Sequence, residues 1–285
     1  MKKKNKSDVV VLGAGYSGII SAYFVGDCTI IERNNELKLT ENPSFSVHRY
    51  IPGICIRERF LWGLTGFSNS DDYYSLKVYG KFVDLDLRFK TVSKIKIWSF
   101  DDEKILKKVL KNINFGVNIV SGSLKQKSLT DSEGNTFYYD VLISTIPLPV
   151  LLRIYNIQAF DSLKFVKYPI GIIKRKVDLG IDYSFQIYDP SFMDLFYRIY
   201  YCCVNKVMFE EYSLANPACG NMKFDVVLDP GRIEKTEGKD LVLIREMLKE
   251  NGIYLVGRYA LWNPDFLVED IPSFLQEEKI SIARD

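Results

Sequence analysis

Hydrophobic and polar positions follow two different periods along this chain, and the first change of period lies close to its start. "DVVVLGAG", residues 8–15, is an apolar, β-branched run with the length of a buried strand. "YSGIISAYFVG", residues 16–26, has the composition of a helix, and "CTIIE", residues 28–32, is a second β-branched run. This pattern predicts a strand, a glycine-rich turn, a helix and a second strand.

The next stretch changes character twice. Residues 34–60 show no clear period and are expected to be irregular, whereas residues 61–100 alternate and favour strands. "DDEKILKKVLKNI", residues 101–113, predicts a helix, because acids open it and lysines follow, as the helix dipole prefers. A strand, a hairpin with "SEGN" at its tip and the buried strand "DVLIST" come next, and Pro147 ends that ladder.

The second half of the chain is dominated by strands. Residues 163–213 alternate again and are rich in tyrosine, which predicts a sheet with one face polar enough to line a site. Residues 236–250 favour a helix, "GIYLVGR" is a final buried strand, and a loop and a capped helix follow. We therefore predict an α/β fold in which both chain ends feed a parallel nucleotide-binding sheet and an antiparallel sheet is inserted between them.

Composition and charge exclude several classes of function. The 285 residues allow one large or two modest domains, and 47% hydrophobic with 26% charged residues is ordinary for a soluble protein. A net charge of +2 gives no field that would attract nucleic acid, and the basic run "MKKKNK" is expected to be a frayed terminus. No apolar stretch is long enough to span a bilayer and no signal peptide is recognised, so we predict a cytoplasmic protein without a membrane partner.

Cysteine and histidine usage limits the chemistry further. The single histidine, His48, excludes a multi-histidine metal site, and a Ser–His–Asp or Cys–His unit would have to use it. The cysteines are odd in number and lack CxxC spacing, so neither a disulfide framework nor a zinc site is expected. They are Cys28, Cys55, Cys202, Cys203 and Cys219.

The glycines that follow the first strand have GxGxxG spacing. Gly13 allows a tight turn, Gly15 lets backbone N–H groups approach a pyrophosphate, and Gly18 lets the helix pack close to the strand. Glu32 lies 19 residues after Gly13, at the end of the second strand, where its carboxylate can accept hydrogen bonds from a ribose diol. Strand, helix and acid together favour a dinucleotide site over a glycine-rich helix start without a ligand.

The same acid bears on which dinucleotide is bound. Glu32 would repel the extra phosphate of NADP, although the adjacent Arg33 weakens that repulsion. The chain has no second fingerprint of this kind, which favours one permanently held dinucleotide.

Three segments together resemble a clan of FAD proteins: the flavin amine oxidases, protoporphyrinogen oxidases and UDP-galactopyranose mutases. The segments are "VVVLGAGYSG…IIER", "YYDVLISTIPLPVL" and "GIYLVGRYALW". "LFYRIYY…MFEEYS" is similar to a strand pair in the substrate domain of such proteins. The resemblance implies a Rossmann-like FAD-binding domain of the GR2 type with an inserted antiparallel-sheet substrate domain.

The resemblance also implies domain boundaries. The FAD-binding domain would comprise residues 1–60, 101–150 and 236–285, and the substrate domain residues 61–100 and 151–235.

The implied cofactor is FAD rather than NAD. In such proteins the glycine after the last strand, here Gly257, approaches the ribityl phosphate, and a following helix end near Leu267 and Val268 points at the flavin pyrimidine edge. A positive helix end there stabilises reduced, anionic flavin, and Arg258 adds charge nearby. The predicted cofactor-binding residues are Gly13, Ala14, Gly15, Tyr16, Ser17, Gly18, Glu32, Arg33, Thr145, Gly257, Arg258, Trp262, Leu267 and Val268.

For the reaction, the first hypothesis is an FAD-dependent oxidoreductase of the amine-oxidase type. It would oxidise a C–N or C–C bond of a small-molecule substrate by hydride transfer to flavin N5, a step that needs little acid–base help. The tyrosine-rich sheet near Tyr188 would cover the pocket. The candidate catalytic residues are His48, Arg49, Tyr197 and Arg198.

Two other hypotheses remain open. One is a redox-neutral FAD enzyme, either a mutase-like isomerase or a lyase acting on an amino-acid-modified small molecule or nucleobase. The other is a non-catalytic module that binds flavin as a structural or redox-sensing group. The oligomeric state is left open.

Overall fold

The computed structural model describes residues 4–37, 47, 49–63, 77–78, 95–158, 163, 165–167, 169–188, 194–228, 231–233 and 239–280. Their contacts divide the chain into two compact units. Unit 1 comprises Met1–Leu39, Asp102–Phe165 and Ile233–Asp285, and unit 2 comprises Thr40–Asp101 and Val166–Arg232. The chain passes from one unit to the other after residues 39, 101, 165 and 232. The domain boundaries expected from the sequence lay after residues 60, 100, 150 and 235. The assignment of FAD and substrate to these parts stays a prediction.

Unit 1 is built on a seven-stranded sheet with the order β5-β2-β1-β8-β7-β6, in which β16 also pairs with β8. The pairs β1–β2, β1–β8, β2–β5 and β8–β16 are parallel, whereas β6, β7 and β8 pair antiparallel. The strands are β1 (Lys4–Leu12), β2 (Thr29–Ile31), β5 (Ile113–Asn114), β6 (Ile119–Ser123), β7 (Ser128–Asp131), β8 (Thr136–Ser144) and β16 (Ile253–Leu255).

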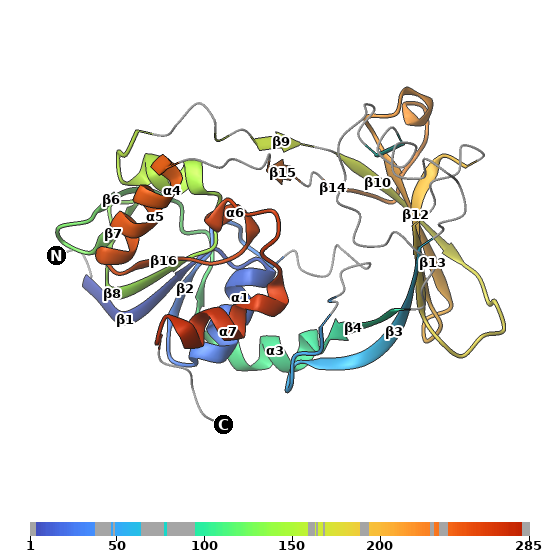
Figure 1. Cartoon of the computed structure of the whole chain (residues 1–285), viewed down its shortest axis with the longest axis horizontal. Coiled ribbons are helices and arrows are strands. Elements are labelled where there is room, and N and C mark those ends of the chain that lie inside the picture. Colours follow the sequence, from blue (N-terminus) through green and yellow to red (C-terminus); the bar gives the residue numbers. More distant parts are fainter. Residues whose placement is uncertain are drawn as a thin grey trace. The chain divides into compact units, whose positions relative to one another are not determined.

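Helices cover both faces of this sheet (Figure 1). Val10, Leu12 and Leu142 share one hydrophobic core with residues of α4 and α5. Val11 and Ile143 point to the opposite face because strand side chains alternate, and on that face α1 contacts α3 and α7. The helices are α1 (Tyr16–Val25), α3 (Asp102–Val109), α4 (Leu148–Ile154), α5 (Lys239–Glu250), α6 (Arg258–Leu261) and α7 (Ile271–Glu277), with 3₁₀ turns η2 (Leu110–Asn112) and η4 (Val268–Asp270).

The parallel strands end together. Leu12 of β1 is paired with Ile31 of β2 and with Ser144 of β8, and Ser144 is paired with Leu255 of β16. All four residues are the last of their strands. This common carboxyl edge is where open α/β sheets bind ligands.

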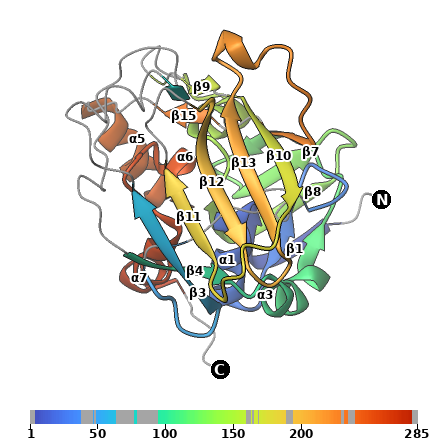
Figure 2. The same ribbon diagram turned by 90° about the vertical axis from the view of Figure 1, so that its right-hand side faces the viewer.

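Unit 2 contains the second seven-stranded sheet, ordered β14-β10-β13-β12-β11-β3-β4 (Figure 2). Its pairings are antiparallel except for β3 with β11, which is parallel. The strands are β3 (Cys55–Gly63), β4 (Ile95–Phe100), β10 (Ile170–Lys176), β11 (Phe185–Tyr188), β12 (Phe196–Cys202), β13 (Val207–Ser213) and β14 (Val226–Leu228), and η3 (Pro217–Cys219) is a 3₁₀ turn. Two short strands, β9 (Phe165–Lys167) and β15 (Gly231–Ile233), pair where the chain passes between the units.

The predicted fold class is confirmed: a mixed α/β chain with a parallel-rich sheet and a separate, largely antiparallel sheet. The predicted hairpin is also present, with Ser132–Asn135 as its tip between β7 and β8. Two local expectations were wrong. Residues 55–60 are the start of β3 rather than irregular, because pairing with β4 and β11 holds a segment whose charges hide the strand period. Lys4–Ser7 are not frayed but pair with Thr136–Tyr139 of β8.

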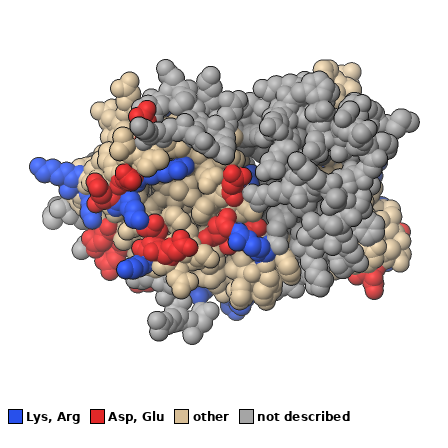
Figure 3. Space-filling model, in the orientation of Figure 1, with Lys and Arg blue, Asp and Glu red and all other residues tan. Residues whose placement is uncertain are grey.

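Surface charge and thiols add little to this picture. On the face shown in Figure 3, the described acidic and basic side chains of unit 1 are interspersed, in keeping with the net charge of +2. All five cysteines are described, and each is a free thiol. None of the helices in the described part of the chain has the length and apolar character needed to cross a membrane.

The β7–β8 hairpin depends on one buried carboxylate. Asp131 Oδ1 accepts hydrogen bonds from the backbone N–H groups of Glu133 (3.0 Å) and Asn135 (2.7 Å), and Oδ2 accepts one from Asn135 Nδ2 (2.9 Å). Burial raises the pKa of Asp131, but these hydrogen bonds lower it by more, so the net shift is downward.

We expect Asp131→Asn to lower the free energy of unfolding by about 1–3 kcal/mol at pH 7. A carboxyl whose pKa is lowered by folding stabilises above its unfolded pKa, and that contribution is lost as the pH falls through the folded value. Chemical unfolding of both proteins should therefore show a gap that narrows below the ordinary aspartate pKa of about 3.9. Glu133→Gln, at the exposed tip, is the control, and a gap of constant size down to low pH would contradict the role of Asp131.

Candidate functional site

The turn after β1 is shaped by glycines. Gly13 has a φ of +98°, a conformation that favours glycine, and its N–H donates to the carbonyl of Ile31 at 2.9 Å. A Cβ on Gly18 would lie 1.9 Å from the carbonyl oxygen of Gly13, so only glycine lets α1 approach the strand end this closely. Thr145 supports the turn from β8, because its Oγ1 donates to the carbonyl of Leu12 at 3.0 Å.

Gly15 differs from its two neighbours in the motif. Its φ of −69° is open to any residue, and a Cβ added there would meet no atom of the described residues within 4 Å. It is also exposed, and it precedes the first residue of α1 without offering a side chain to cap the helix. The first turn of α1 contains no acidic residue, so the partial positive charge of this helix end is not neutralised from within the helix.

Glu32 joins the second strand to this turn. Its Oε2 accepts from the backbone N–H of Ala14 at 2.7 Å, and its Oε1 accepts from that of Asn34 at 2.8 Å. A carboxylate offers about four acceptor positions, so two remain for a diol. Arg33 beside it is exposed.

The C-terminal segment returns to the same place. Gly257 has a φ of +94°, and a Cβ on it would lie 2.5 Å from Oγ of Ser17 in the first turn of α1. The turn between β16 and α6 therefore lies against the glycine-rich turn, and Arg258 is exposed next to it. Sequence segments about 240 residues apart thus meet at one edge of the sheet.

The remaining predicted cofactor residues have different surroundings. Leu267 and Val268 lie at the start of η4, which contacts α1, and the Leu267 N–H donates to the carboxylate of Asp270 at 2.7 Å. The helix that directly follows Gly257 is α6. The helix end that the resemblance implies at Leu267 and Val268 belongs to the next helical segment, η4. Trp262 is 1% exposed within the hydrophobic core, in a left-handed conformation, and its buried Nε1 has no hydrogen-bond partner in the described part of the chain.

Unit 2 contains a separate polar cluster centred on a fully buried carboxylate. Glu211 Oε2 accepts from the hydroxyl of Tyr197 at 2.9 Å and from Nε of Arg198 at 2.8 Å, and Arg198 Nη2 forms a second bond to it. Two consecutive strand residues normally point to opposite faces. Here the register shifts between Phe196 and Arg198, and this bulge brings both side chains to one acceptor.

The cluster continues into β11. Tyr188 lies opposite Arg198, whose guanidinium carbon is 5.7 Å from the centre of the Tyr188 ring. Gln186 Nε2 donates to the Tyr188 hydroxyl at 3.1 Å, while the buried Oε1 of Gln186 has no hydrogen-bond partner among the described residues. Burial, and then the charge of Glu211, raise the pKa of Tyr197 well above its ordinary value, so its phenol stays protonated.

The four predicted catalytic residues are only partly brought together. Tyr197 and Arg198 share the Glu211 carboxylate. Arg49 is exposed in the segment before β3, and in the sheet β11 lies between β3 and the strand β12 that carries Tyr197 and Arg198. His48 lies outside the described residues. Sequence reasoning missed Glu211 and Gln186, although the two adjacent acids in the apolar strand "VMFEEYS" were a usable signal, because buried charges need partners.

Comparison with known proteins places the fold. No protein-family model matches the sequence, and no curated protein matches it significantly in sequence. Solved structures do match along nearly the whole chain. A reduced UDP-galactopyranose mutase superposes with a TM-score of 0.63 at 15% identity, covering 96% of this chain and 94% of that one. The chain has the fold of the FAD-binding flavoproteins.

Two further structures with this flavoprotein fold are similar. L-proline dehydrogenase from P. horikoshii has a TM-score of 0.57 at 10% identity, covering 98% of this chain and 94% of that one. A CLA-producing fatty acid isomerase from P. acnes has a TM-score of 0.54 at 12% identity, covering 95% and 98%. The resemblance found in the sequence is thus confirmed at the level of the flavoprotein fold.

The sheet of unit 2 offers a matched pair of variants, because Glu210 has a similar environment on the opposite face. Glu210 bonds to Arg175 at 2.8 Å and to Tyr212 at 2.7 Å, but Arg175 is 54% exposed whereas Arg198 is 18% exposed. We expect Glu211→Ala to lower the free energy of unfolding by about 3–5 kcal/mol, because it removes the carboxylate that balances the partly buried guanidinium of Arg198. Glu210→Ala should cost clearly less, since water can solvate Arg175. Equal losses in chemical unfolding would contradict this account of the cluster.

Proposed function

We propose that this chain is an FAD-dependent enzyme and that the turn of residues 13–18 holds the pyrophosphate of its FAD. The observation that carries the proposal is the open space above Gly15. The motif is tightly packed at Gly13 and Gly18, yet a Cβ on Gly15 would meet none of the residues that the structure describes, and the uncompensated start of α1 lies beside it. A turn that served only to pack a helix would have no need for glycine at the one uncrowded position.

The surrounding residues fit the rest of an FAD molecule. Glu32, fixed by the N–H groups of Ala14 and Asn34, would accept hydrogen bonds from the adenosine ribose. The turn at Gly257 would pass close to the ribityl phosphate, since it already touches Ser17. Arg258 would stabilise negative charge on the ring system. The helix end at Leu267 and Val268 is less suited to this, because Glu269 and Asp270 lie in its first turn and Asp270 accepts from the Leu267 N–H. When bound, FAD supplies the ability to accept and return a hydride.

We further propose an oxidoreductase that oxidises a C–N or C–C bond of a small molecule. Tyr197 and Arg198 are assigned to substrate contact. Glu211 is fully buried and bonded to Arg198, and the phenol of Tyr197 stays protonated and donates to Glu211, so neither group is placed to remove a proton from a substrate. Hydride transfer from a neutral substrate is the chemistry that such a cluster can support.

A redox-neutral isomerase or lyase is the second candidate. It is favoured by the sharing of this fold with a mutase and an isomerase, at TM-scores of 0.63 and 0.54. In that case the same residues would bind and orient a substrate whose net oxidation state does not change. The third hypothesis is a protein that binds flavin without catalysing a reaction.

Gly15→Ala tests the cradle. The substitution should weaken FAD binding by about tenfold or more, equivalent to about 1.4 kcal/mol, because the added methyl group occupies the path of the pyrophosphate. Thermal stability of the apoprotein should not change, since both the backbone angles and the space at residue 15 accept alanine. Titration of the apoprotein with FAD, followed by flavin fluorescence, measures the effect.

Two variants control this test. Gly18→Ala should lower thermal stability instead, because its methyl group would collide with the Gly13 carbonyl. Glu36→Gln, an exposed acid four residues beyond Glu32, should bind FAD as the unchanged protein does. Normal FAD affinity in stable Gly15→Ala would refute the cradle.

The reaction class is tested anaerobically with amines and with sugar nucleotides. We expect a substrate of the first group to bleach the flavin of the oxidised protein, and Arg198→Lys to raise KM for that substrate while Arg175→Lys does not. Turnover that occurs only after reduction by dithionite, without net oxidation of substrate, would instead establish the redox-neutral candidate.

A further inference from the structure

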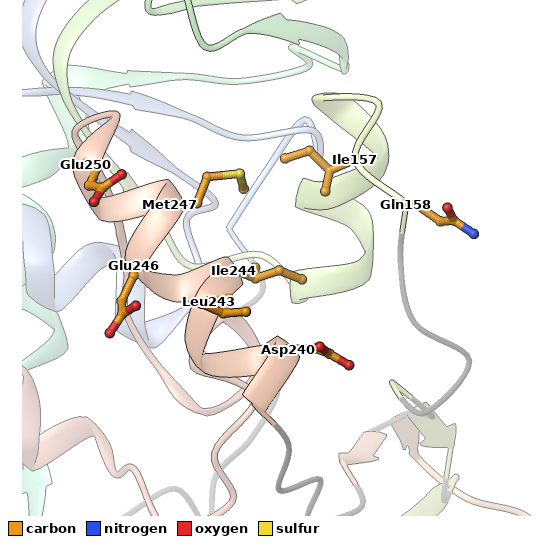
Figure 4. A pocket seen from close by; sticks show the side chains of 8 residues that line it. All are labelled: Ile157, Gln158, Asp240, Leu243, Ile244, Glu246, Met247 and Glu250. Carbon is orange, nitrogen blue, oxygen red and sulfur yellow. The ribbon is translucent and has the colours of Figure 1, made fainter.

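A hollow of about 440 Å³ lies on unit 1, away from the glycine-rich turn in sequence and built mainly by one helix. Figure 4 shows α5 running along it, with the end of the segment after α4 on its other side. We call it the α5 hollow. It is lined by Ile157, Gln158, Asp240, Leu243, Ile244, Glu246, Met247 and Glu250.

The middle of the α5 hollow is apolar. Leu243, Ile244 and Met247 occupy one stretch of α5, and Ile157 lies across from them (Figure 4). Leu243 is 60% exposed, and the neighbouring Val242 is 51% exposed. Single exposed leucines are common, but here the exposed side chain borders a concave apolar surface, which is typical of a binding site.

The rim of the hollow is acidic and its charges are not balanced. Asp240, Glu246 and Glu250 form no hydrogen bond or ion pair with the residues that the structure describes. Two basic residues of the same helix are engaged elsewhere: Lys249 pairs with Glu278, and Arg245 donates to backbone carbonyls at Leu261 and Trp262. A cation placed in the hollow would therefore meet three carboxylates for which neither Lys249 nor Arg245 competes.

Two of these acids are unfavourable for the helix itself. Glu250 is the last residue of α5, where the partial negative charge of the helix end repels a carboxylate. Glu246 precedes it by four residues, and like charges at this spacing repel each other on a helix surface. A bound cation would relieve both repulsions.

We propose that the α5 hollow is a docking site for a basic, amphipathic helical segment of a partner protein. The apolar side chains of the partner segment would fill the space between Leu243, Met247 and Ile157. The lysines or arginines of that segment would pair with the acidic rim. Asp240 and Glu250 are ten residues apart, a span of about 15 Å along the helix, so three turns of a partner helix match the site. Nucleic acids and anionic membranes would be repelled by the same carboxylates. This inference does not depend on FAD binding or on the reaction.

The probe is a fluorescein-labelled helical peptide of about 14 residues, or about four turns, with leucines on one face and lysines flanking them. Two control peptides are matched to it. In one, glutamate replaces each lysine, and in the other, serine replaces each leucine. In fluorescence anisotropy with the full chain, the first peptide should bind about tenfold more tightly than either of the others. Its affinity should fall as salt is raised, because the rim pairs are exposed.

Variants then locate the binding. Two variants should each weaken binding about fivefold or more: the single variant Leu243→Ser, and the double variant Glu246→Gln with Glu250→Gln. Neither should lower thermal stability, since these side chains are exposed. Glu103→Gln, at an exposed position on α3, is the matched control and should have no effect. Equal binding by Leu243→Ser, equal weakening by Glu103→Gln, or equal affinity for the glutamate peptide would overturn the proposal. Self-association of the chain that Leu243→Ser abolishes would assign the hollow to a second copy and would also overturn it.

Discussion

The close approach of Gly18 to the carbonyl of Gly13 is the contact on which the proposed FAD-binding edge depends. Because a Cβ on Gly18 would lie 1.9 Å from that oxygen, any other residue would push α1 away from β1. The position of α1 in turn fixes the first-turn residue Ser17, against which Gly257 packs. One absent side chain thus sets where the N-terminal and C-terminal segments of the chain meet.

The same edge shows how glycine, acid and helix end act together. Gly13 turns the chain, Gly15 leaves space, and Glu32 ties the end of β2 to the turn through the Ala14 N–H. The helix end attracts negative charge, while the carboxylate is placed to accept hydrogen bonds. A diphosphate linked to a ribose combines both requirements, and this is why the geometry favours a dinucleotide over a simple anion.

Sequence reasoning was most successful where the determinants are local. Spacing and turn chemistry in the sequence alone locate three features: the glycine-rich turn, the acid after β2 and the hairpin tip at residues 132–135. The Glu211 cluster could not, because it depends on the bulge at Tyr197 and on pairing between β12 and β13. The first part of strand β3, residues 55–60, was missed for a related reason, since pairing with β4 and β11 holds it rather than its own apolar period.

The visible absorbance spectrum of the purified protein, after incubation with FAD and removal of unbound flavin, tests the central claim most directly. The account predicts the absorbance bands of a bound flavin, present at about one equivalent for each chain, because the chain has a single cradle of this kind among its described residues. A protein that folds normally, remains colourless after this treatment and binds NAD instead would contradict it.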